Sequence, residues 1–457
     1  MIPRFSGVAR ATCAALVVTA LGLPAVPVAA EPIVPPGAAQ PGTAQPGTAQ
    51  PDTARPGAVQ PDPGQPVTST TPPFTTPDTA TCPQKNLPPP PVDSSEVPAP
   101  GEPTPSPLPV PVPALGGPRM GECGVVLPDG APDAPADISA TSWLVSDLDT
   151  GAVLAAKDPH GRYRPASTIK VLLAIVALRA LDMDEVVIGT QEAANVEGSR
   201  VGIGPGGRYT NRQLMQGLLM SSGNDAAHLI AAQLGGDAAA VAKMNETAKS
   251  LSAFDTRAAT PSGLDGPGMS TSAYDLSALW REAMTIPLFA ELVRTEQVDF
   301  PGYPADPAMP GDTDHPGFPI GNDNMLLYNY EGALGGKTGF TDDARQTFVA
   351  AAERDGRRLA VVLLKADVRP IRPWEQAARL LDYGFALPAD AAVGALPGAA
   401  AHLDGPTVVP AAPPLDGDLA APHTVSHTDT RALLVLVGCV AVVVLLLGAF
   451  RANRRRR

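Results

Sequence analysis

The chain has 457 residues and a formal net charge of −13, and its 54 prolines concentrate in residues 31–118 and near residues 388–414. Its basic runs are confined to the last residues, so the sequence gives no support for nucleic-acid binding. Proline-rich segments bury too little apolar surface to offset their chain entropy. The sequence therefore predicts that residues 125–388 are the globular part, long enough for one large core or for two lobes sharing a cleft.

Residues 1–30 have the pattern of an export signal peptide. Arg4 and Arg10 supply a basic start, an apolar stretch follows, and Val28-Ala29-Ala30 is a plausible cleavage site. An uncleaved anchor is the alternative interpretation. Residues 31–124 are predicted as an extended, disordered proline-rich arm, because degenerate repeats of Pro-Gly-Thr-Ala-Gln form no core.

Strands and helices alternate in the predictions for residues 125–388. Two β-prone runs around Asp149-Thr150-Gly151 predict one hairpin, and Asp355-Gly356 predicts another. From Ser167 the apolar residues recur at helical spacing. We expect an α+β domain with an antiparallel sheet, backed by helices, and a mostly helical insert. The predicted strands are 142–147, 152–157, 334–337, 346–353 and 359–365, and the predicted helices are one from Ser167, 211–220, 225–234 and 376–383.

The C-terminal region predicts a membrane anchor. Residues 389–430 are rich in Ala, Pro and Asp and are expected to form a flexible linker. The apolar run that follows is long enough to span a bilayer, which predicts a transmembrane helix at residues 431–451. The arginines of the tail, residues 452–457, belong on the cytoplasmic side. The sequence thus predicts a single-pass cell-membrane protein whose globular part is extracytoplasmic, on the cell-wall side.

Cysteine and histidine usage agrees with export and gives no sign of a metal site. Cys13 lies in the signal peptide and Cys439 in the predicted membrane helix. Cys82 and Cys123 remain, and in an oxidising compartment a disulfide between them is favoured over two free thiols. The six histidines are scattered and none clusters with a cysteine.

The first motif with catalytic potential is Ser167-Thr168-Ile169-Lys170. On a helix, positions three apart share a face, so the serine hydroxyl and the lysine amine are neighbours. A serine needs a base to become a nucleophile, and a desolvated lysine with a lowered pKa can be that base. Arginine cannot, because it stays protonated. Taken alone, however, this spacing also fits an ordinary helix start.

Two further motifs follow along the chain. Ser222-Gly223-Asn224 falls at a break between two predicted helices, where these residue types also fit a simple turn. Lys337-Thr338-Gly339 falls on a predicted strand, where glycine lets a substrate backbone approach and the lysine offers a cation. An ordinary strand end is the alternative interpretation of that motif.

The order of the three motifs is typical of penicillin-binding proteins and class A β-lactamases. Together with Pro261-Ser262-Gly263-Leu264-Asp265 and residues 270–276, they make residues 125–388 resemble the low-molecular-mass D-alanyl-D-alanine carboxypeptidases of the penicillin-binding protein group. The resemblance implies a central antiparallel sheet flanked by helices with an all-helical lobe, and an active site between the lobes.

The resemblance also implies roles for individual residues. Ser167 would be the acylated nucleophile and Lys170 its base, and Ser222, Asn224 and Lys337 would form the proton-transfer and positioning network. The backbone N–H groups of Ser167 and Phe340 would bind the oxyanion, and Gly339 of the third motif would also lie at the substrate. Thr338 and Thr341 could hydrogen-bond the terminal carboxylate of the substrate. Arg372 is a further candidate for that carboxylate, although it could equally be an arginine exposed to solvent.

The implied reaction is removal of the terminal D-alanine from peptidoglycan stem peptides ending in D-Ala–D-Ala, with no metal or organic cofactor. β-Lactam antibiotics are expected to act as covalent inhibitors, because they resemble that dipeptide. A serine β-lactamase is one alternative, although residues 257–261 hold no glutamate to activate the deacylating water, and Glu246 is too near the second motif. A peptidoglycan endopeptidase and a non-catalytic wall scaffold are the others.

Overall fold

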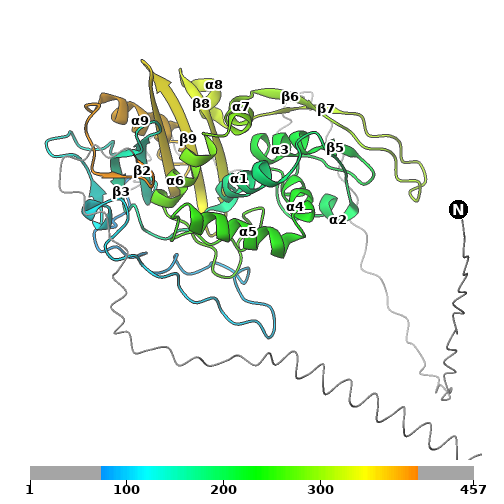
Figure 1. The fold of residues 1–457 in the computed structure, drawn as a ribbon, viewed down its shortest axis with the longest axis horizontal. Helices are drawn as coiled ribbons and strands as arrows, with labels where there is room; N and C mark the ends of the chain where they lie inside the picture. The colour runs from blue at the N-terminus through cyan, green and yellow to red at the C-terminus, as the bar shows by residue number, and fades with distance from the viewer. Residues whose placement is uncertain (1–73, 400–457) are drawn as a thin grey trace, which may run out of the picture. The chain divides into compact units, whose positions relative to one another are not determined.

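A computed structural model describes residues 74–399 (Figure 1). Its centre is a seven-stranded antiparallel sheet in the order β1-β3-β2-β10-β9-β8, with β11 paired to β3. The edge strand β8 is the one that carries the third motif. The strands are β1 (Val125–Val126), β2 (Ser142–Asp147), β3 (Ala152–Lys157), β8 (Ala333–Thr341), β9 (Arg345–Arg354), β10 (Arg357–Ala366) and β11 (Gly394–Ala395).

The centre of the sheet is buried on both faces, which explains why β10 reads as a nearly continuous apolar run. Alternate side chains of β10 enter two different cores. Val361 and Leu363 belong to the core that includes Leu380 of helix α9, while Val362 belongs to the core that includes Leu172 of helix α1. The turn between β9 and β10 has positive φ at both Asp355 and Gly356, as the predicted hairpin requires.

The helical lobe lies to one side of the sheet (Figure 1). Helices α1, α3, α4 and α5 pack together there, and two small hairpins, β4–β5 and β6–β7, complete it. The helices are α1 (Lys170–Ala180), α2 (Gln191–Ala194), α3 (Asn211–Met220), α4 (Asn224–Gln233), α5 (Asp237–Ser250), α6 (Ala273–Ala283), α7 (Pro287–Arg294), α8 (Met325–Asn329) and α9 (Pro373–Ala386), with 3₁₀ turns η1 (Pro118–Gly121) and η2 (Ala166–Ile169). The hairpin strands are β4 (Val186–Ile188), β5 (Arg208–Thr210), β6 (Gln297–Phe300) and β7 (Phe318–Gly321).

The prediction of a disordered arm at residues 31–124 is wrong for its second half. Residues 74–124, here called the strap, run across the surface of the domain as the blue and cyan segment of Figure 1. Prolines offer carbonyl oxygens but no N–H groups, so a proline-rich segment is held mainly by hydrogen-bond donors. The domain supplies them as cationic side chains: Arg162 donates to Asn86 O and Pro109 O, Arg257 to Ser106 O, and Lys157 to Pro77 O.

The predicted disulfide between Cys82 and Cys123 is confirmed. It closes a loop that contains most of the strap, so the two ends of this loop lie side by side on the domain. The bond therefore limits how far the strap can move from the surface even when individual side-chain contacts break.

The prediction of a transmembrane helix is corrected. Across residues 74–399, no helix combines the length and the apolar character that a bilayer span needs. The helices α5 and α9 have 14 residues each, or about 21 Å, against a hydrocarbon core of about 30 Å. The predicted span at 431–451, the signal peptide at 1–30 and the tail at 452–457 lie outside the described residues. Part of the predicted 389–430 linker is folded, because β11 pairs with β3 and Leu396 is buried.

Candidate active site

The first motif forms a single tight turn that leads into a buried helix. Ser167 lies in the 3₁₀ turn η2, and Lys170 begins α1. In a 3₁₀ turn, residues i and i+3 lie almost directly above one another. Lys170 Nζ accordingly lies 2.7 Å from Ser167 Oγ. Ala166, just before the serine, has a φ of 47°, a strained value for a residue other than glycine.

The environment of Lys170 favours the neutral amine. Burial, with a further contribution from the Lys337 cation, holds the pKa of Lys170 well below its usual value. Its Nζ donates to Asn224 Oδ1 at 2.7 Å and to the carbonyl of Ser262. A neutral amine that makes these two donations retains one lone pair, which is the group needed to accept the Ser167 proton.

The second motif is assembled in part. Asn224 begins α4, and its Nδ2 donates to Glu197 O at 2.7 Å, which leaves Oδ1 directed at Lys170. Ser222 lies in the break between α3 and α4, with a φ of 57° and a nearly buried side chain. Within residues 74–399, no hydrogen bond joins the Ser222 hydroxyl to Lys170 or Lys337. The structure thus brings Asn224 to the base, while the role of Ser222 stays a prediction.

The third motif lies on β8, whose outer edge is unpaired in the sheet. A Cβ at Gly339 would lie 2.9 Å from the Ser167 backbone nitrogen and 2.4 Å from Thr347 Oγ1, so only glycine lets the strand pass so close to η2, the turn that carries the predicted nucleophile Ser167. Lys337 is buried, and its Nζ donates to Thr338 O at 2.9 Å. Burial lowers the pKa of Lys337, and the Asp323 carboxylate opposes that shift.

The remaining predicted residues lie around this strand. The Phe340 side chain is 50% exposed, and Thr341 Oγ1 accepts from Ala344 N at 3.0 Å, so this hydroxyl is already engaged in a turn. Arg372 precedes α9, where its backbone N–H donates to Glu375 Oε2. Arg372 and Thr338 line the same cavity of about 510 Å³. The carboxylate-binding roles of Thr338, Thr341 and Arg372 stay predictions.

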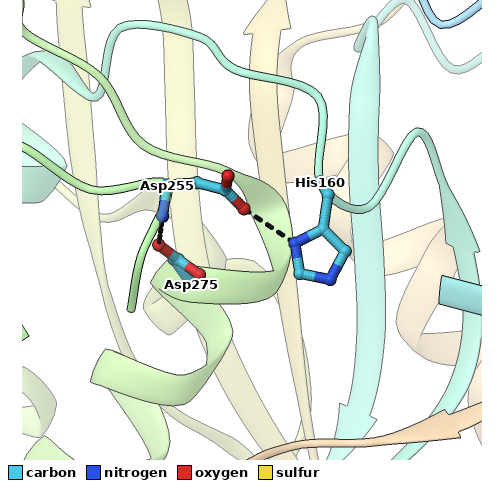
Figure 2. A group of neighbouring side chains, drawn as sticks. All are labelled: His160, Asp255 and Asp275. Atoms are coloured by element: carbon cyan, nitrogen blue, oxygen red, sulfur yellow. Dashed lines mark hydrogen bonds and ion pairs between the residues drawn. The ribbon is translucent and has the colours of Figure 1, made fainter. Parts of the chain in front are cut away.

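One group of His and Asp side chains in the described part of the chain brings ligand-type atoms within 4.8 Å of one another (Figure 2). His160 Nδ1 lies 2.7 Å from Asp255 Oδ2, and Asp255 N donates to Asp275 Oδ2. These atoms are already engaged: Arg162 donates to the other Asp255 oxygen, and His160 Nε2 lies 3.1 Å from Leu115 O. A neighbouring guanidinium disfavours a bound cation, so we interpret this group as structural.

Residues 129–368 match the sequence profile described as D-alanyl-D-alanine carboxypeptidase. The chain is also 46% identical over 269 residues to D-alanyl-D-alanine carboxypeptidase DacB2 of Mycobacterium tuberculosis. The aligned region covers 58% of this chain and 87% of that relative.

The chain belongs to the D-alanyl-D-alanine carboxypeptidase family.

Solved structures agree with this assignment. The crystal structure of a D-alanyl-D-alanine carboxypeptidase from Mycobacterium tuberculosis H37Rv matches with a TM-score of 0.55 and 45% identity, covering 59% of this chain and 100% of that one. The Streptomyces K15 DD-transpeptidase matches with a TM-score of 0.51 and 27% identity, covering 56% of this chain and 100% of that one. The carboxypeptidase is therefore a serine hydrolase with a penicillin-binding-protein fold, as the motifs predicted.

Several groups of the carboxypeptidase site were missed from the sequence. The carbonyls of Ser262 and Glu197 orient Lys170 and Asn224, yet backbone groups have no signature of their own in a sequence. Asp323 acts electrostatically on both lysines, but in the sequence it belongs to none of the three motifs. Only Ser262 had a signal, because its segment was part of the family resemblance.

Proposed function

We propose that the carboxypeptidase acts through an acyl-enzyme on Ser167, with Lys170 as the general base. The contact of 2.7 Å between Lys170 Nζ and Ser167 Oγ carries this proposal, because it places a lysine with a lowered pKa against the only hydroxyl in the first motif that faces it. The preferred substrate is a peptidoglycan stem peptide that ends in D-Ala–D-Ala.

In the acylation step, the Ser167 proton moves to Lys170 as Oγ forms a bond to the penultimate D-alanine carbonyl carbon. The negative charge on that carbonyl oxygen would be held by the N–H groups of Ser167 and Phe340. Close approach of these two backbone segments at Gly339 supports this assignment. The C–N bond then breaks, and the departing D-alanine amine receives the proton.

In the deacylation step, water attacks the ester carbonyl and gives a proton to Lys170. The ester C–O bond to Ser167 breaks, the serine regains its hydrogen, and the shortened peptide leaves. The Lys337 cation and the hydroxyl of Thr338 would bind the terminal carboxylate of the incoming substrate. Their place on an unpaired strand edge next to the nucleophile turn supports that role. β-Lactams would acylate Ser167 by the same first step.

We further propose that the enzyme works outside the cytoplasm, where its peptidoglycan substrate lies. The disulfide between Cys82 and Cys123 supports this location, because such bonds persist in oxidising compartments.

The test is release of free D-alanine from a stem pentapeptide by the full chain, compared with Ser167→Ala. Without its hydroxyl the variant cannot form the ester, so we expect kcat to fall by more than about a thousandfold. Labelling by a fluorescent penicillin should disappear in parallel. Release of D-alanine at the wild-type rate by a folded Ser167→Ala protein would exclude Ser167 as the nucleophile.

A further inference from the structure

The strap contacts the chain directly before the nucleophile. Arg164, three residues ahead of Ser167, has a side chain that is only 2% exposed, and its ion-pair partner is Glu96 of the strap. Arg164 Nη2 donates to Glu96 Oε2 at 2.8 Å, Nε contacts the other carboxylate oxygen, and Nη1 donates to Pro89 O at 2.8 Å. The guanidinium is thus held by a two-point carboxylate contact and a carbonyl, all three supplied by the strap.

The turn that follows Arg164 needs support from its surroundings. Positive φ at Ala166 is a strained conformation, which persists only where neighbouring groups enforce it. Thr347 of β9 donates to Pro165 O at 2.8 Å. Gly263 lies so close that a Cβ there would be 2.1 Å from Ala166 O. Both of these supports lie within the family match at 129–368, whereas the strap lies outside it.

The same strap segment also holds the strand on the other side of the site. Val92 N donates to Asp343 Oδ1 at 2.5 Å, and Asp343 lies two residues after Thr341, the last residue of β8. The strap therefore binds both backbone segments that meet at Gly339: the nucleophile turn through Arg164 and the end of β8 through Asp343.

We propose that Glu96 and Val92 of the strap are positioning residues for the carboxypeptidase reaction. Through Arg164 and Asp343 they fix the nucleophile turn relative to β8, and so hold the N–H groups of Ser167 and Phe340 in register. The inference rests on the proposed function, since it assumes that Ser167 is the nucleophile. Neither strap residue touches the reacting atoms.

The test compares three variants of the full chain. Glu96→Ala leaves Arg164 without its carboxylate, and Val92→Pro removes the N–H that reaches Asp343 without changing Arg164. We expect each to lower kcat and the rate of acylation by penicillin about ten- to a hundredfold, with KM little changed, because small misplacements of reacting groups cost this much. Glu96→Gln keeps one acceptor oxygen for Arg164 but replaces the other carboxylate oxygen with an NH2 group, so it should recover only part of the loss.

The matched control is Arg119→Ala, which removes an exposed ion pair with Glu122 elsewhere in the strap. It should leave kcat unchanged. Melting temperatures of all variants separate positioning from loss of fold: a lowered kcat in a protein that melts like the wild type supports the inference. Wild-type kcat in both Glu96→Ala and Val92→Pro would overturn it. A wild-type protein that penicillin does not acylate would instead overturn the proposed function.

Discussion

Two buried lysines lie at the candidate active site, and the Lys337 cation affects the protonation of Lys170. Lys170 and Lys337 are both fully buried, and burial lowers the pKa of each. The Lys337 cation lowers the pKa of Lys170 further, while Asp323 acts in the opposite direction on both. Burial and Lys337 therefore favour the neutral amine of Lys170, whereas Asp323 favours the ammonium form of both lysines.

This balance predicts the effect of Asp323→Asn. Removal of the negative charge disfavours the ammonium form of Lys170, so its pKa falls and the neutral base exists at lower pH. We expect the acidic limb of the pH profile of kcat/KM to move to lower pH. The amide oxygen can still accept from Thr338, which the carboxylate contacts at 3.3 Å. Asp299→Asn, an exposed strand residue, is the control that should leave the profile unchanged, and a shift of the limb to higher pH in Asp323→Asn would contradict this account.

Gly339 gives a second prediction at the residue scale. In Gly339→Ala the new Cβ would lie 2.4 Å from Thr347 Oγ1 and 2.9 Å from Ser167 N, so the strand must move away from the turn. We expect penicillin acylation to slow by more than about a hundredfold and stability to fall by only about 1–3 kcal/mol. Gly321→Ala on β7, where the nearest atoms lie 4.0 Å away, should acylate like the wild type. Equal acylation rates for both variants would be evidence against the close approach.

The residues that could be predicted from the sequence are those whose side chains do chemistry at fixed spacing. Ser167 and Lys170 come together because a tight turn dictates it, and Asn224 joins them as the resemblance implied. The carbonyls of Ser262 and Glu197 could not be predicted, because any residue type supplies the same backbone oxygen.

At the scale of elements, the interior strands β2 and β3 and the strap show which features the sequence predicts and which it does not. The predicted strands 142–147 and 152–157 coincide with β2 and β3, because two short β-prone runs around an Asp-Thr-Gly turn leave few alternatives. The strap was predicted as disordered because the composition of a segment indicates only whether that segment can form a core by itself. Its order comes from donors on the domain, such as Arg162 and Arg164, which are distant in sequence.

The disulfide makes this attachment testable. In a Cys82→Ser, Cys123→Ser double variant, the strap is held by side-chain contacts alone, so its amides should exchange with deuterium faster than in the wild type. Loss of a loop closed across 41 residues would lower the free energy of unfolding by up to about 4 kcal/mol on chain entropy. Hydrogen exchange followed by mass spectrometry measures both strap and core. Peptides from β9 and β10 are the internal reference, and unchanged strap protection would show that the disulfide adds nothing to its attachment.

At the scale of the whole molecule, buried groups of opposite kinds give opposing contributions to the pH dependence of stability. Burial lowers the pKa of Lys157 to about 8 and that of Lys170 well below its usual value. Between about pH 8 and the ordinary value of 10.5, both therefore bind fewer protons in the folded than in the unfolded protein. These lysines add stability as pH rises toward their unfolded-state values. Burial and the Asp255 carboxylate raise the pKa of Asp275 to about 8, which acts in the opposite direction.

Comparison of the wild type with Asp275→Asn separates the contribution of Asp275 to the pH dependence of stability from that of the lysines. The folded-state pKa of Asp275 is raised, so its contribution is fully present below the unfolded value of 3.8 and is lost as pH rises through about 8. His160 acts with the same sign: burial opposes its protonation, but its hydrogen bond to Asp255 and the nearby carboxylates outweigh burial and raise its pKa. Asparagine cannot ionise, and the lysine contributions cancel between the two proteins.

We therefore expect the free energy of unfolding of the wild type, relative to Asp275→Asn, to decrease steadily between pH 5 and about pH 8. Urea unfolding at several pH values and constant ionic strength measures this difference. His160→Gln removes the imidazole that contacts Asp255, so the wild type relative to the Asp275→Asn, His160→Gln double variant should show a steeper decrease with pH. A difference that stays constant or increases with pH would mean that Asp275 is ionised in the folded protein, and that its buried oxygen has a partner that balances the charge.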